Sequence, residues 1–99
     1  MQFVIIAKDA TDAEALSRRM QARHGHLAHI RDGIETGEQI MAAAMLDQDE
    51  KMCGSVMFVE FENREKLDEW LAEEPFVTEK VWGDIQVIPC RIPDIFSKA

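Results

Sequence analysis

The alternation of apolar side chains in residues 54–61 is the pattern on which the rest of the interpretation depends. This run begins at a glycine and is rich in β-branched and aromatic residues, which is typical of a β-strand. Alternate side chains of a strand point to opposite faces. The two sets are Val56 and Phe58 on one face, and Met57, Val59 and Phe61 on the other. Both sets are apolar, which indicates a strand covered on both faces, because a sheet with one wet face has one polar set.

Three other short runs are strand-like: residues 2–7, 39–46 and 84–91. Residues 2–7 are again apolar on both faces. The alanines of residues 39–46 favour a helix. The run is short, however, and lies between a glycine and an acidic turn, so we interpret it as a strand whose small side chains leave room for a pocket. Pro89 indicates an edge strand, or a late position in the last strand.

The segment between the first two strands carries a helical pattern. Leu27, Ile30 and Ile34 recur at helical spacing and define its expected buried face. Gly25 leaves open whether this segment forms one long helix or two. Gly37 fits the left-handed position at which many helices end.

A second helix is expected to begin after Asn63, a good N-cap, and to end before Pro75. The predicted order is therefore strand, helix, strand, strand, helix, strand, which is the ferredoxin-like split βαβ arrangement of an α+β protein. Both helices would cover one sheet face. We expect the face with Met57, Val59 and Phe61 to stay open and to pack against a second copy, giving a dimeric α/β barrel.

Length and charge limit the classes of function. The 99 residues fit one domain, residues 1–99, and Ile95 and Phe96 of its short tail are expected to dock rather than stay in solvent. A net charge of −8 argues against nucleic-acid and anionic-membrane partners, because both require a cationic surface.

The sequence contains no apolar run long enough to span a membrane and no signal-peptide features, so we expect a cytoplasmic protein. The absence of a phosphate loop, a nucleophile motif and metal-type cysteine spacing predicts no cofactor and no metal.

Candidate chemistry begins with His24, His26 and His29. Their spacing does not place all three on one helix face, which argues against a shared metal. His29 lies well away from the predicted apolar stripe and should be solvated; His26 lies on its flank, where it could still reach a cleft. Glu74 precedes Pro75, which disfavours helical geometry at Glu74 and places its side chain at a junction. From these residues alone, a structural histidine and an exposed glutamate are the simpler interpretations.

Over nearly its whole length the chain resembles the YciI-like (YCII-related) family in the order and spacing of short motifs. The motifs are His26-Leu27, Gly54-Ser55-Val56, residues 71–77 (Leu-Ala-Glu-Glu-Pro-Phe-Val) and Ile88-Pro89. The resemblance implies a homodimeric ferredoxin-like barrel and a His/Asp pair in a cleft, proposed as a general acid–base site. The pair falls on His26 and Glu74, so a glutamate stands where the family has aspartate. Within these motifs, Ser55 and Phe76 are our candidate ligand contacts, although Ser55 also suits the small-residue start of a strand.

Two functions stay open after this comparison. The first is a cofactor-free His/carboxylate acid–base enzyme of lyase or isomerase type that acts on a small polar organic molecule. The resemblance implies such chemistry, since a family member eliminates chloride from a chlorinated hydroxyquinol. The second is a non-catalytic module that binds a small ligand or acts as an accessory dimer. Haem-degrading monooxygenases share dimeric barrels, but the fold alone suggests that activity.

Overall fold

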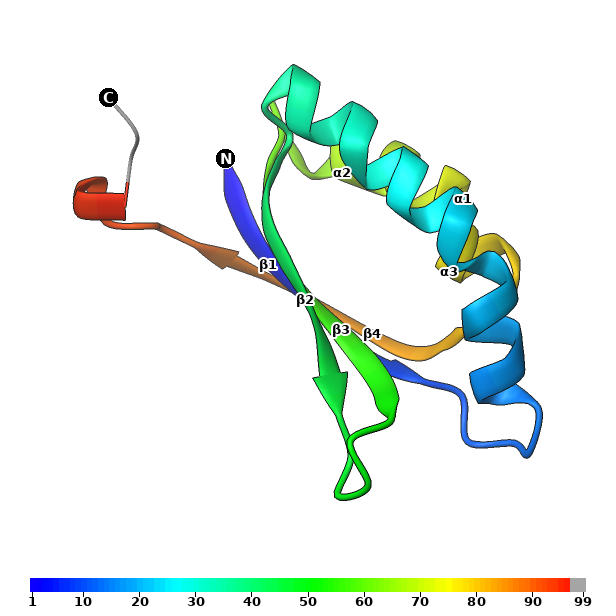
Figure 1. Ribbon diagram of the computed structural model, residues 1–99. Coiled ribbons are helices and arrows are strands. Elements are labelled where there is room, and N and C mark those ends of the chain that lie inside the picture. Colours follow the sequence, from blue (N-terminus) through cyan, green and yellow to red (C-terminus); the bar gives the residue numbers. More distant parts are fainter. Residues whose placement is uncertain (97–99) are drawn as a thin grey trace.

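The computed structural model describes residues 1–96 and consists of a four-stranded antiparallel sheet with the α-helices on one of its faces (Figure 1). The strands lie in the order β2-β3-β1-β4. The elements are β1 (Gln2–Asp9), α1 (Ala15–Thr36), β2 (Gln39–Leu46), β3 (Met52–Glu60), α2 (Arg64–Glu73), α3 (Pro75–Thr78), β4 (Trp82–Cys90) and the 3-10 helix η1 (Asp94–Phe96). This is the ferredoxin-like α+β fold, as predicted.

Local signals place the ends of the two longer helices. Gly37 has φ 85°, and its N–H bonds to the carbonyl of Ile34, so the left-handed end of α1 is confirmed. The side chain of Asn63 accepts a hydrogen bond from the Lys66 N–H at 2.9 Å, which confirms it as the N-cap of α2. Gly25 does not interrupt α1, which is one continuous helix of 22 residues.

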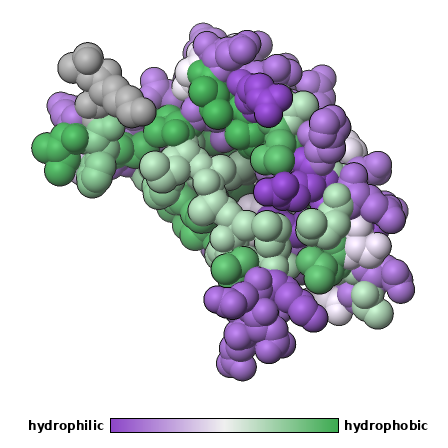
Figure 2. Space-filling model, viewed as in Figure 1, coloured by the Kyte–Doolittle hydropathy of each residue, from purple (hydrophilic) through white to green (hydrophobic). Residues whose placement is uncertain are grey.

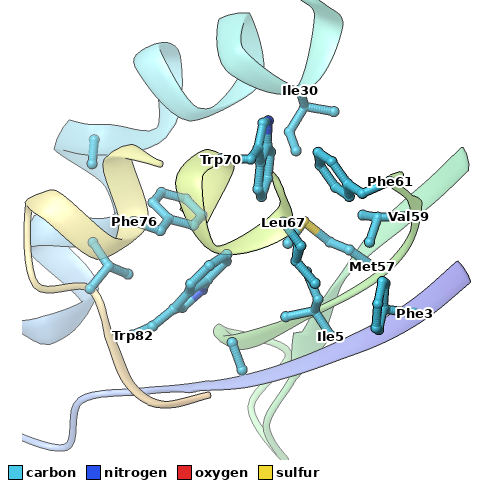
Figure 3. Packing of buried hydrophobic residues seen from close by; sticks show 13 residues of the cluster. Phe3, Ile5, Ile30, Met57, Val59, Phe61, Leu67, Trp70, Phe76 and Trp82 are labelled. Atoms are coloured by element: carbon cyan, nitrogen blue, oxygen red, sulfur yellow. The ribbon is translucent and has the colours of Figure 1, made fainter. Parts of the chain in front are cut away.

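The hydrophobic core lies between the sheet and the helices (Figure 3). Met57, Val59 and Phe61 are 0%, 0% and 4% exposed and belong to this core. Our prediction that they form the open sheet face was therefore wrong. The two faces of β3 are both apolar, and the alternation of side chains does not show which of them the helices cover.

The opposite sheet face carries the other apolar set. Cross-strand neighbours share a face, and the register aligns two rows of side chains there. The first row consists of Met41, Phe58, Val4 and Ile88, and the second row, next to the first, consists of Ala43, Val56, Ile6 and Gln86. We call these eight residues the open face, because no helix of residues 1–96 covers it (Figure 1).

The C-terminal segment extends beyond β4, away from the helices (Figure 1). Ile95 and Phe96 lie in η1 and are 86% and 70% exposed, so they do not dock within residues 1–96 of one chain, and their docking stays a prediction. Residues 97–99 of the predicted tail lie outside the described residues. Within residues 1–96, no helix combines the length and the apolarity that crossing a bilayer requires.

Candidate active site

The buried face of α1 is built from small and polar residues. Its buried positions follow a helical spacing of three or four residues: Ala15, Arg19, Ala22, His26, Ile30 and Gly33. Leu27 and Ile34 are 39% and 60% exposed, so the predicted stripe of large aliphatic residues was wrong in two of its three members. As a consequence, α1 turns a histidine and an arginine toward the interior.

Glu74 lies at the junction of α2 and α3, where the sequence predicted it. The residue has φ −69° and ψ 124°, which is extended backbone, as expected for a position before proline. This geometry turns its side chain back over the start of α3, where Glu74 Oε1 accepts the Phe76 N–H at 3.3 Å. The carboxylate is not exposed but fully buried.

Two histidines of α1 meet this buried carboxylate. His26 Nδ1 contacts Glu74 Oε1, and His29 Nδ1 lies 2.5 Å from Glu74 Oε2. The prediction that His29 is solvated was wrong, because it followed from the incorrect apolar stripe. His24, by contrast, is exposed. The carboxylate therefore holds one imidazole on each oxygen.

Aromatic rings fix the orientation of both imidazoles. The ring of His26 stacks on Phe76, with centroids 3.8 Å apart and an interplanar angle of 8°. The ring of His29 stacks on Trp70, with centroids 4.5 Å apart and an angle of 9°. Since Glu74 and Phe76 belong to one turn of the chain, the Glu-Pro-Phe sequence supplies both the carboxylate and the ring that hold His26.

The hydrogen bonds define which imidazole nitrogen is free. A carboxylate oxygen accepts and does not donate, so the Nδ1 atoms of His26 and His29 carry the protons that face Glu74. In the neutral form of His26, Nε2 is then the ring nitrogen without a proton. His26 is also one of the residues that line a cleft, described next.

The cleft lies between α1 and the strands β2 and β3, and its volume is about 180 Å³. The predicted ligand contacts Ser55 and Phe76 both line it, together with His26. The remaining lining residues are Arg19, Arg23, Leu27, Ala42, Ala43, Ala44 and Met52. The small side chains of Ala42 and Ala44 lie on the sheet face under the helices and leave room beside β2, which agrees with the predicted pocket wall.

A second buried polar cluster, missed by the sequence analysis, borders the cleft. Arg19 Nη1 pairs with Asp9 at 2.7 Å, and Arg19 Nη2 donates to Ser55 Oγ at 2.9 Å and to the carbonyl of Gly54 at 3.0 Å. The guanidinium carbon of Arg19 lies 4.7 Å from the centroid of the Phe76 ring. The signal for this cluster was the spacing of seven residues between Arg19 and His26, which places them on one helix face.

Burial dominates the electrostatics of this ion pair. Burial raises the pKa of the Asp9 carboxyl above its ordinary value, and the Arg19 guanidinium opposes the rise without cancelling it. Within residues 1–96, no group of three or more His, Cys, Asp and Glu side chains is arranged to hold a metal ion.

Solved structures place this fold among known proteins. A 5-chloro-2-hydroxyhydroquinone dehydrochlorinase (TftG) from Burkholderia phenoliruptrix, solved with 2,5-dihydroxybenzoquinone, matches 96% of this chain and 98% of its own, with a TM-score of 0.81 and 20% identity. A dimeric ferredoxin-like protein of unknown function from Jannaschia covers 92% and 98%, with a TM-score of 0.50 and 17% identity. At these identities the likeness shows the fold alone.

The sequence comparisons decide the family. Protein YciI of Escherichia coli is 30% identical over 97 residues, which are 92% of this chain and 97% of that protein. An uncharacterised protein of Haemophilus influenzae is 28% identical over 98 residues, with the same coverage. The model of the YCII-related domain matches residues 1–91. The chain belongs to the YCII-related family.

Proposed function

We propose that this protein is a cofactor-free acid–base enzyme, of lyase or isomerase type, which acts on a small polar organic molecule in the cleft. His26 would transfer the proton, and Glu74 would orient the imidazole ring of His26. The observation that carries the proposal is the contact between His26 Nδ1 and the fully buried carboxylate of Glu74, on a histidine that lines a cleft. A carboxylate in this position fixes the tautomer and the angle of the imidazole, which a general base requires.

The reaction step follows from this geometry. Nε2 of His26 takes a proton from a carbon or oxygen atom of the substrate, and the electron pair left behind forms a double bond or an enolate. The imidazolium that results is stabilised by Glu74, which already accepts its Nδ1–H. The proton then returns to another atom in an isomerisation, or is lost to solvent when a leaving group departs in an elimination.

The structural neighbour supports this class of chemistry by analogy. Its name describes a dehydrochlorinase, and loss of hydrogen chloride requires that a base removes a proton while chloride departs. The pair of His26 and Glu74 is able to supply such a base without a metal or an organic cofactor. The neighbour's substrate is not assigned to this chain.

Replacement of His26 tests the proposed chemistry. We expect His26→Gln to lower the rate of proton transfer by about 10²–10⁴-fold, the usual contribution of a positioned general base. The measurement is proton exchange in D₂O, followed by NMR, on a panel of small carbon acids and phenols, together with chloride release from 5-chloro-2-hydroxyhydroquinone. His24→Gln is the matched control, since His24 is an exposed histidine of the same helix.

The outcomes separate the two open functions. Equal rates of proton transfer for His26→Gln and for the unchanged protein would contradict the proposal that His26 is the catalytic base. Ligand binding in the cleft without any exchange or elimination would favour the alternative, a module that binds a small molecule.

We further propose that two copies of the chain pack their open faces together. Each row of the open face runs across all four strands, and the first row is entirely apolar. Full burial of one large apolar side chain contributes about 1.5–3 kcal/mol, so a shared interface recovers a substantial free energy. Figure 2 shows hydrophobic residues over the β2 side of the molecule and again on the C-terminal segment at the left. A solved structure of the same fold, from Jannaschia, is described as dimeric.

A charge on the open face is expected to break this dimer. Met41 is 67% exposed at the end of the first row, so Met41→Asp disturbs the isolated chain little and places a carboxylate in the interface. Light scattering after size-exclusion chromatography should give twice 11.3 kDa for the unchanged protein, and dimerisation at least about tenfold weaker for the variant. Ile34→Asp, an equivalent change on the 60% exposed outer side of α1, should leave the mass unchanged. An unchanged protein that stays monomeric at high micromolar concentration would refute the dimer.

A further inference from the structure

The charge of the cleft is opposite to that of the whole chain. The protein has 19 acidic and 11 basic residues and a net charge of −8. Among the described residues that line the cleft, two are arginines, one is a histidine and none is a carboxylate. A cavity with such walls is suited to a ligand with negative charge.

The two arginines have different roles in this wall. Arg19 is 3% exposed, and its guanidinium is already bound to Asp9, Gly54 and Ser55. Arg23 is exposed, and within residues 1–96 its side chain makes no ion pair or hydrogen bond. Arg23 is therefore the cation of the cleft that is available to a ligand.

Ser55 has a hydroxyl proton that no described residue accepts. The Oγ atom accepts two hydrogen bonds, from Arg19 Nη2 at 2.9 Å and from Trp82 Nε1 at 3.3 Å. A hydroxyl has two acceptor positions and one proton, so both acceptor positions are occupied and the O–H is left to donate. The residue is 4% exposed and lines the cleft. Its neighbour Arg19 has a buried Nε that also lacks a partner among the described residues.

We propose that the cleft binds an oxyanion, such as a carboxylate, enolate or phenolate, of a small flat molecule. The oxyanion accepts the Ser55 O–H and pairs with Arg23, next to Nε2 of His26. Ala42 and Ala44, whose side chains face the helices, supply apolar contact. A cavity of about 150 Å³ is enough for benzene, so the volume of about 180 Å³ accommodates one substituted ring. This inference names the substrate class of the proposed acid–base site and rests on that site being where the substrate binds.

Binding of benzoate and of its neutral isostere benzamide tests this inference without any turnover. We expect benzoate to shift the backbone amide signals of residues 42–44 and 55 in NMR titrations, and benzamide to bind at least tenfold more weakly. Arg23→Gln should weaken benzoate at least tenfold and remove most of the salt dependence of binding. Arg31→Gln, another exposed arginine of α1 outside the cleft, should have no effect.

Ser55→Ala should also weaken benzoate about tenfold, while benzamide changes less. Equal affinities for benzoate and benzamide, affinities that do not depend on Arg23, or no binding of benzoate at millimolar concentration would each overturn the inference. The two proposals fail separately. If neutral substrates are turned over in a way that depends on His26, the acid–base enzyme is supported and the binding of an oxyanion is rejected. If benzoate binding depends on Arg23 but His26 transfers no proton, the binding of an oxyanion is supported and the acid–base enzyme is rejected.

Discussion

Replacing Arg19 with methionine is expected to destabilise the folded protein by about 3–5 kcal/mol at pH 7, since removal of one partner leaves a buried charge without compensation. The side chains of Arg19 and Asp9 are 3% and 7% exposed. The change also removes the donors to Ser55 and to the carbonyl of Gly54. Methionine keeps most of the volume, so the loss of free energy reports the charge and its hydrogen bonds rather than a cavity. Urea unfolding at one fixed protein concentration measures it.

The pH dependence of this loss gives a second signature. In the intact protein burial already raises the pKa of Asp9 above its ordinary value of 3.8, although Arg19 opposes the rise. Without Arg19, only burial acts, so the pKa of Asp9 should rise further. A carboxyl raised in this way contributes stability that is present below its unfolded-state pKa and is lost as the pH rises through its folded-state pKa. Arg19→Met should therefore cost less near pH 4 than at pH 7.

A double variant is the control for this interpretation. Asp9→Asn in the Arg19→Met background removes the buried charge, and it should recover part of the stability and abolish the extra pH dependence. A loss that is the same at both pH values, and that Asp9→Asn does not reduce, would show that the ion pair is not the cause.

Replacing Glu74 with alanine is expected to cost about 3 kcal/mol of folding free energy. The carboxylate is the acceptor for two imidazoles and for the Phe76 N–H, and it is fully buried. Each buried donor that is left without an acceptor costs about 1–3 kcal/mol, although the histidines are able to reorient in part. Glu73→Ala is the matched control, since Glu73 is exposed at the end of α2 and should change stability by less than about 0.5 kcal/mol.

Glu74→Gln separates the charge from the shape of this side chain. The amide has one acceptor oxygen and one donor nitrogen, so it can accept an Nδ1–H from one histidine and must donate to Nδ1 of the other. One of the two imidazoles should then change its tautomer. A Glu74→Ala variant as stable as the Glu73→Ala control would mean that the carboxylate does not organise this region.

Local sequence rules predicted the elements well because their causes are local. Gly37 ends α1 through a left-handed backbone, Asn63 caps α2 through its side chain, and Pro75 forces Glu74 out of the helix. The alanine-rich run, which composition alone would assign to a helix, is the strand β2 with the predicted bounds. Pro89 was predicted to lie in an edge strand or late in the last strand, and it lies in β4, which is an edge strand.

Choices between two faces were not predictable in the same way. In β3 both faces are apolar, so no residue marks the one that the helices cover. In α1 the large aliphatic residues Leu27 and Ile34 are exposed, and the buried face includes Arg19 and His26. The contact of His29 with Glu74 was missed for the same reason, because hydrophobicity does not orient a helix whose buried face is held by ion pairs and hydrogen bonds.

The site itself was only partly contained in the sequence. The pairing of His26 with Glu74 was expected from the family resemblance, and the structure brings the two side chains together. Nothing local indicated that a single carboxylate would bind two histidines, or that Ser55 would have both acceptor positions occupied by Arg19 and Trp82. Such contacts join positions far apart in the chain and depend on the packing of α1 against the sheet.

The position of the proton on His26 is the most direct test of the account. Long-range ¹H–¹⁵N correlation spectra of the imidazoles, recorded on the unchanged protein and on Glu74→Gln, report which ring nitrogen is protonated. We expect neutral His26 to carry its proton on Nδ1, toward Glu74, and to leave Nε2 without a proton in the cleft; in the variant, one of the two histidines should change its tautomer. A neutral His26 protonated on Nε2, with spectra that Glu74→Gln leaves unaltered, would contradict this expectation.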